Sequence, residues 1–160
     1  MREGKRKEPE SAKFYSHIMS GIEIDGDKFQ IEYFGESNPN FKPYDKYPEH
    51  AGVSSDMVLF LKNNPYLISE FKCPTRDIHF DRLRKLKKYD DDIKGNERYL
   101  FLKQYCKEYY AQIQFNMMCW KVNLGHWVSY NEFFPMDERM IIIEVPADKS
   151  FQLNLNLTLS

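Results

Sequence analysis

The chain has 160 residues with a formal net charge of −1, and 42% of the residues are hydrophobic and 16% aromatic. This length suits one domain with a hydrophobic core, and the composition excludes a disordered tail. No apolar run approaches the ~20 residues of a membrane helix, and the charged N-terminus lacks the apolar segment of a signal peptide. Three cysteines without disulfide or zinc spacing favour a reducing, intracellular compartment. The near-zero net charge excludes a uniformly basic nucleic-acid coat but permits a local basic groove.

The first third of the chain predicts a helix, a pair of strands and a loop. Apolar residues recur at helical spacing over residues 8–20, and Gly21 is expected to end the helix. Residues 22–33 alternate around Asp25-Gly26, which indicates strands joined by a tight turn. Three prolines predict a long loop over residues 36–50. Its aromatic side chains could stack on nucleic-acid bases or fold back onto the core; they are Phe41, Tyr44 and Tyr47.

The remaining elements follow from the same patterns. Residues 52–61 and 66–73 predict a strand hairpin that turns at Asn63-Asn64-Pro65. A short charged helix is expected after Thr75, and a longer one over residues 97–122. Two further strands are expected over residues 126–134 and 139–147. The alternating tail, residues 151–160, favours a strand, although the spacing of its leucines also fits a helix.

Ionised side chains interrupt the second strand of this hairpin. Glu70 and Lys72 are costly to bury, and their spacing places both on one face of the strand. Asp56 shares a face of the first strand with Val58, so the two acids and Lys72 converge if the faces coincide. Such carboxylates suit Mg²⁺ or Mn²⁺, and the lysine could stabilise a phosphate or an attacking water. The alternative is a cross-strand salt bridge on a solvated face.

A polar and aromatic stripe follows one side of the longer helix. The stripe consists of four residues at helical spacing, Tyr105, Tyr109, Gln112 and Asn116. It lies on a different side of the helix from the apolar stripe. Hydroxyl and amide groups on this stripe could orient a water or a phosphate. A partly solvated stripe without a ligand is the other interpretation.

Four sequence blocks resemble the lambda exonuclease and viral-recombinase (YqaJ-like) branch of the PD-(D/E)XK nuclease superfamily. They are "EGKRKEPESAKFYSHIMSG", "GVSSDMVLF", "ISEFKCP" and "EYYAQIQFNMMCW", in the family's order. The resemblance implies an α/β fold with a restriction-endonuclease-like core, in which a mixed central β-sheet is flanked by helices. It further implies a single nuclease domain over residues 1–160. The sequence stops without a terminating signal, which fits a trimmed core of a longer chain. The family's N-terminal segment has no counterpart in these residues, so we expect distributive digestion and a weak preference for a 5′ phosphate.

The same resemblance assigns roles at the site. Glu8, Asp56 and Glu70 would hold Mg²⁺ or Mn²⁺, with the Phe71 carbonyl as a further ligand. Lys72 would stabilise the attacking water or the scissile phosphate, and Gln112 would position it. Expected nucleic-acid contacts are Lys5, Arg6, Arg76, Arg82, Lys85, Tyr105, Tyr109 and Gln114. For the basic residues after Pro74, a DNA-backbone groove and a merely solvated helix face are equally compatible with the sequence.

These assignments predict a metal-dependent deoxyribonuclease. We expect it to act as an exonuclease on duplex DNA ends, in viral or phage-type recombination or genome processing. An endonuclease or an RNA-cleaving nuclease on the same core is the first alternative. A non-catalytic nucleic-acid-binding module is the second. DNA is the expected partner, with a homo-oligomer or a recombinase as further candidates and no membrane.

Overall fold

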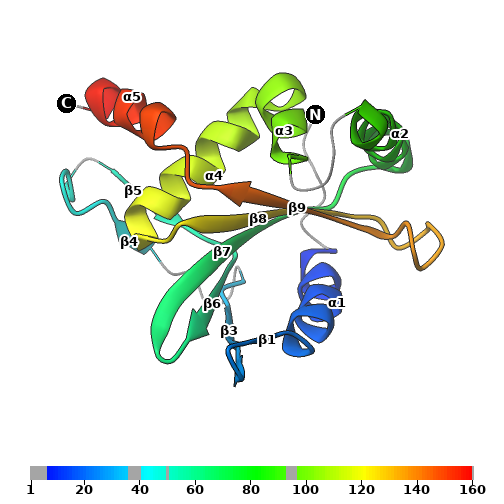
Figure 1. The fold of residues 1–160 in the computed structure, drawn as a ribbon, viewed down its shortest axis with the longest axis horizontal. Helices are drawn as coiled ribbons and strands as arrows, with labels where there is room; N and C mark the ends of the chain where they lie inside the picture. Colours follow the sequence, from blue (N-terminus) through cyan, green and yellow to red (C-terminus); the bar gives the residue numbers. More distant parts are fainter. Residues whose placement is uncertain (1–6, 36–40, 50, 93–96, 160) are drawn as a thin grey trace.

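A five-stranded mixed sheet forms the centre of the computed structural model, which describes residues 7–35, 41–49, 51–92 and 97–159. Its strands lie in the order β3, β6, β7, β8, β9 (Figure 1). Their bounds are β3 (Gln30–Tyr33), β6 (Met57–Leu61), β7 (Asn64–Lys72), β8 (Leu124–Tyr130) and β9 (Met140–Pro146). Only the β7–β8 pair is parallel within this sheet. The expected α/β class with a mixed central sheet is confirmed.

Helices cover both faces of the sheet. Figure 1 shows α1 (Glu8–Ser20) on one side and the other helices on the opposite side. The other helices are α2 (Arg76–Asp92), α3 (Tyr99–Tyr105), α4 (Lys107–Trp120) and α5 (Lys149–Leu159). A parallel strand pair needs a long crossover, and α2, α3 and α4 provide the one between β7 and β8. None of the helices in the described ranges has the length and apolar character to cross a membrane.

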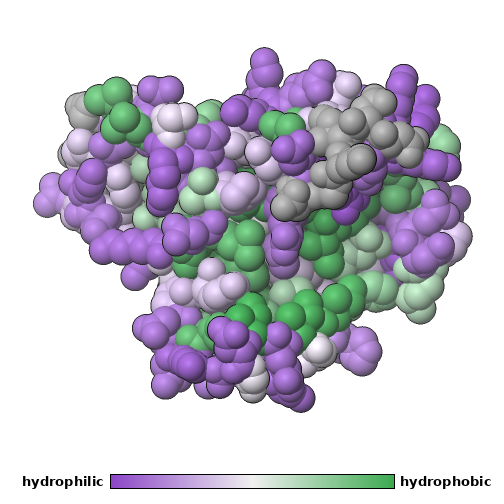
Figure 2. All heavy atoms as spheres, in the orientation of Figure 1, coloured by the Kyte–Doolittle hydropathy of each residue, from purple (hydrophilic) through white to green (hydrophobic). Residues whose placement is uncertain are grey.

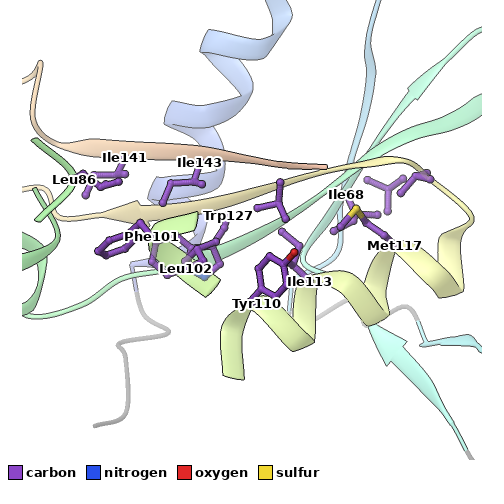
Figure 3. Close-up of a cluster of buried hydrophobic side chains, with 13 residues drawn as sticks. Ile68, Leu86, Phe101, Leu102, Tyr110, Ile113, Met117, Trp127, Ile141 and Ile143 are labelled. Atoms are coloured by element: carbon purple, nitrogen blue, oxygen red, sulfur yellow. The ribbon is translucent and has the colours of Figure 1, made fainter. Parts of the chain in front are cut away.

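Each face of the sheet has its own hydrophobic cluster. On the α4 side, Ile113 and Met117 point from the helix toward Ile68 and Trp127 of the strands (Figure 3). On the α1 side, Tyr15 and Met19 pack on strand residues that include Phe71. Figure 2 shows hydrophilic side chains over most of the visible surface, with hydrophobic ones gathered in a band across its middle.

The alternation of β7 decides which side chains meet α4. Leu67 and Phe71 belong to the α1-side cluster, whereas Ile68 belongs to the α4-side cluster. Because successive strand residues point to opposite faces, Glu70 and Lys72 lie on the α4 face with Ile68. The predicted sharing of one face by these residues is confirmed.

The two tight turns differ in how well their positions were predicted. Asp25 and Gly26, with φ of 52° and 83°, join the short strands β1 (Glu23–Ile24) and β2 (Asp27–Lys28) as expected. The β6–β7 turn lies at Lys62 and Asn63, with φ of 52° and 67°, earlier than predicted. A two-residue turn of this kind needs positive φ at both positions. Proline is fixed near φ −65°, so Pro65 lies outside the turn, in the returning strand that begins at Asn64.

Three other expectations need correction. The predicted long helix over residues 97–122 is divided at Cys106, whose φ of −135° and ψ of 58° are not helical. The tail is the helix α5 and not a strand. The proline-rich segment contributes β4 (Phe41–Pro43), which pairs with β5 (Gly52–Ser54). Its Tyr44 is buried, whereas Phe41 is 61% exposed.

Candidate active site

Glu70 is a buried carboxylate in the middle of the sheet. It is 3% exposed, and the Asn116 side chain donates a hydrogen bond of 2.5 Å to its Oε1 atom. Ser55 Oγ donates to Asn116 Oδ1 at 3.2 Å, and the Trp120 indole donates to Ser55 Oγ at 3.1 Å. A buried carboxylate without partners would be strongly destabilising, so this chain of donors fixes Glu70 in place.

Asp56 lies beside Glu70, at the start of β6. Its Oδ2 atom accepts a 2.9 Å hydrogen bond from the backbone N–H of Phe71. Burial raises the pKa of Glu70 well above its usual range, and the charge of Asp56 and a hydrogen bond with it raise it further. Lys72 acts in the opposite direction. The structure therefore brings the two acids together, as the strand pattern predicted.

Glu8 approaches this pair from the first turn of α1. The hydroxyl of Tyr33, on β3, donates a 3.0 Å hydrogen bond to Glu8 Oε2. Burial raises the pKa of Tyr33, and the charges of Glu8 and Asp56 add to the rise. The charge of Glu8 also contributes to the raised pKa of Glu70. Tyr33 therefore links Glu8 to the site, a role that nothing in its local sequence indicated.

Lys72 points toward α4. Its Nζ atom is 3.4 Å from Gln112 Oε1 and 4.5 Å from the centre of the Tyr109 ring. Gln112 is exposed and Lys72 is partly exposed, so both amide and ammonium groups reach solvent beside the buried acids. The structure thus brings together Lys72, Gln112 and Tyr109, which the sequence predicted as site residues.

The oxygen donors of this site suit a hard divalent cation. No three His, Cys, Asp or Glu side chains within the described ranges are arranged to hold a metal ion. Mg²⁺, however, commonly takes only one or two protein carboxylates and fills its remaining positions with water and phosphate oxygens. Asp56 and Glu70 fit that requirement, because they are two adjacent acids, one of them buried, whose negative charge a cation would compensate. Glu8 and the Phe71 carbonyl as further ligands remain predictions.

The predicted basic contacts occupy different environments. Arg82 is 7% exposed, donates to Ser129 Oγ at 3.0 Å and lies 4.8 Å from the centre of the Trp127 ring. It is therefore part of the packed interior and not of a solvated helix face. Lys85 lies over the Tyr105 ring at 4.9 Å, and its ammonium is 2.9 Å from Asp81 Oδ2.

The other predicted contacts divide between the surface and the undescribed N-terminus. Arg76 is exposed, with its guanidinium 4.6 Å from the centre of the Phe133 ring. Tyr105 is 50% exposed at the end of α3. Lys5 and Arg6 lie outside the described residues.

The assignment of Gln114 to nucleic-acid contacts is wrong. Gln114 is fully buried, and its Nε2 donates to the Pro146 carbonyl at 3.0 Å. Its Oε1 accepts from the Asp148 N–H at 3.0 Å and from Gln152 Nε2 at 2.9 Å. These three hydrogen bonds are all made within the protein, so the Gln114 side chain joins α4 to β9 and α5. Nothing in the local sequence indicated this role, because the burial of Tyr110, four residues before it, is a finding of the structure.

Asn116 and Ser55 were missed as partners of the acids. Asn116 was placed on the polar stripe of the helix, but nothing indicated that its side chain meets Glu70. Ser55 precedes Asp56 directly and is 2% exposed. Glu70 and Ser55 lie 46 and 61 positions from Asn116 along the chain, so helical spacing alone could not reveal these contacts.

Comparison with solved structures gives the fold a counterpart. The structure is similar to that of an alkaline exonuclease (LHK-Exo) from Laribacter hongkongensis, with 18% sequence identity and a TM-score of 0.61. The match covers 98% of this chain and 62% of that one. The structure of LHK-Exo in complex with dAMP matches at 19% identity and a TM-score of 0.61, covering 98% of this chain and 63% of the other. The chain therefore spans about three fifths of the length of these structures and shares their fold. No protein-family model and no curated protein matches the sequence.

Proposed function

We propose that this protein is a metal-dependent nuclease that hydrolyses phosphodiester bonds of DNA, with duplex ends as its preferred substrate. The observation that carries the proposal is the buried Glu70 beside Asp56, with Lys72 on the same strand face. A salt bridge on a solvated face does not explain this arrangement, because Glu70 is 3% exposed and receives its short hydrogen bond from Asn116.

The fold supports the proposal independently. The matched structures are of an exonuclease, and one of them holds a nucleoside monophosphate. Fold alone does not determine function, since one fold can carry many activities. The acids, the lysine and the amide of this chain therefore carry the assignment, and the fold agrees with it.

The residues of the site divide the chemistry between them. A bound Mg²⁺ or Mn²⁺ would neutralise charge on the scissile phosphate. Asp56 and Glu70 would hold it, with Asn116 fixing the Glu70 carboxylate. Lys72 places a positive charge where the phosphate develops negative charge, and preorganised charges of this kind stabilise a transition state strongly. Gln112 accepts from Lys72 and so sets the direction of its ammonium group.

We base the proposed preference for ends on the cost of opening a duplex. Glu70 is buried, so a phosphate must approach closely, and a closed duplex must first unstack an internal pair at a cost of a few kcal/mol. A terminal pair frays more easily. Viral or phage-type recombination or genome processing is the setting in which we place such an activity, with a second copy of the chain or a recombinase as candidate partners.

The proposal is tested by digestion of end-labelled linear duplex and of relaxed closed circles of the same sequence, each with Mg²⁺ and with EDTA. We expect rapid, Mg²⁺-dependent loss of label from the linear duplex and slow cleavage of the circles. Equal rates on both substrates would replace the exonuclease with an endonuclease. Absence of cleavage of either substrate with Mg²⁺ or Mn²⁺ would overturn the nuclease assignment.

A further inference from the structure

A pocket of about 350 Å³ adjoins the candidate active site. Volumes of roughly this size are typical of small-ligand sites. The residues that bear on its chemistry are Lys7, Cys73, Thr75, Arg76, Asn131 and Phe133. Lys7 directly precedes Glu8, and Cys73 directly follows Lys72, so the pocket borders the site at two separate points of the chain. The pocket therefore lies beside the Glu8 end of α1 and the Lys72 end of β7.

The pocket offers an aromatic ring and cationic groups to a ligand. Phe133 is 65% exposed although it is a large apolar side chain. The Arg76 guanidinium lies 4.6 Å from the centre of its ring. Among the described residues the acid that lines the pocket is Glu132, and its pairing with Lys7 at 2.7 Å compensates its charge. An aromatic ring beside cations is the usual combination for single-stranded nucleic acid, where the ring stacks on a base and the cations meet the phosphates.

Hydrogen bonds hold this pocket in shape without a ligand. Asn131 is 8% exposed, and its Nδ2 atom donates to the Pro74 carbonyl at 3.0 Å. Its Oδ1 atom accepts from the backbone N–H of Phe133 at 3.0 Å. One buried amide therefore fastens the β8–β9 hairpin to the segment that follows Lys72 and fixes the backbone from which the ring projects. A preformed site of this kind loses little entropy when a ligand binds.

We propose that this pocket binds a nucleobase of the strand being cut, which stacks on Phe133 while Arg76 meets a neighbouring phosphate. The proposal rests on the proposed nuclease function and adds a base-binding subsite next to its reacting phosphate. Stacking tolerates every base, so the subsite would hold the strand without selecting its sequence.

The test is the equilibrium affinity, by fluorescence anisotropy, for a dye-labelled, nuclease-resistant thymidine phosphorothioate tetranucleotide and for an abasic chain of the same length. We expect Phe133→Leu to bind the thymidine chain about 5- to 100-fold more weakly and the abasic chain as the parent does. Phe133→Trp keeps a stacking surface and should retain the affinity. Met136→Ala is the matched control, because Met136 is also 65% exposed on this hairpin but does not line the pocket.

Failure of the subsite and failure of the nuclease assignment give different results. Unchanged affinity of Phe133→Leu for the thymidine chain, or an equal loss on both chains, overturns the subsite even if the parent digests DNA. Loss confined to the thymidine chain supports the subsite as a nucleic-acid contact even if the parent cleaves nothing, in which case only the nuclease function fails.

Discussion

At the residue scale, Lys72 is the side chain whose effect on catalysis can best be measured apart from its effect on protein stability. It is partly exposed, it contacts the Gln112 amide and the Tyr109 ring, and its charge lowers the pKa of Glu70. Lys72→Ala should therefore keep the fold but lower kcat by about 10³-fold or more, because charge stabilisation of a transition state contributes several kcal/mol. Initial rates on linear duplex, with circular dichroism as the check on folding, measure both effects.

Lys62→Ala is the control for Lys72→Ala. Lys62 is a lysine of the same hairpin with 71% side-chain exposure and an ion pair to Asp27 at 3.3 Å. Its loss should leave cleavage unchanged. Activity of Lys72→Ala within tenfold of the parent would assign Lys72 a structural role.

Asn116 tests the support of the buried acid. Asn116→Ala removes the donor to Glu70 and leaves a buried carboxyl group short of a partner, which should lower the free energy of unfolding by about 1–3 kcal/mol. Urea denaturation measures this loss. Asn154→Ala, at an exposed position of α5, should change stability by less than about 0.5 kcal/mol. If the two variants were equally stable, the hydrogen bond to Glu70 would not hold the site together.

At the element scale, α5 is fastened to the core through Asp148. Its Oδ1 atom accepts from the Phe151 N–H at 3.2 Å, which caps the helix, and its Oδ2 atom accepts from the Tyr110 hydroxyl at 2.7 Å. The hydrogen bond from Tyr110 lowers the pKa of Asp148, and the contacts with Phe151 and Lys103 act in the same direction. The contribution of charged Asp148 to the free energy of unfolding is therefore fully present above the ordinary pKa of an aspartate. It is lost as the pH falls through the lowered pKa of Asp148.

Asp148→Ala should accordingly cost about 1 kcal/mol of unfolding free energy near neutral pH, the usual loss for a helix cap. The difference from the parent should shrink as the pH falls below about 4, because Asp148 then binds a proton in the unfolded state before it does in the folded state. Urea midpoints across this range measure the difference. Asp137→Ala, in the exposed β8–β9 turn, should show little effect at any pH. A cost for Asp148→Ala that does not change with pH would exclude a charged Asp148 as its source.

At the scale of the whole molecule, the sequence predicted the class of fold and the centre of the site. Alternation in β7 placed Glu70 and Lys72 on one face because strand periodicity is local. The partners of these residues were not predictable in the same way. Asn116 meets Glu70 only because α4 packs across β7, and Gln114 is buried only because α5 covers it. A strand was favoured for the tail because its leucines alternate. In the structure Asp148 caps this segment, which forms the helix α5.

The most direct test of the account is the position of Mn²⁺ in crystals of the protein soaked with that ion, located by anomalous diffraction. We predict a peak at coordinating distance from the carboxylates of both Asp56 and Glu70, because a cation would compensate the charge of these two acids, of which Glu70 is buried. The peak should be absent from crystals of Glu70→Gln. Mn²⁺ bound elsewhere with none between Asp56 and Glu70, or a peak that persists unchanged in Glu70→Gln, would contradict the account.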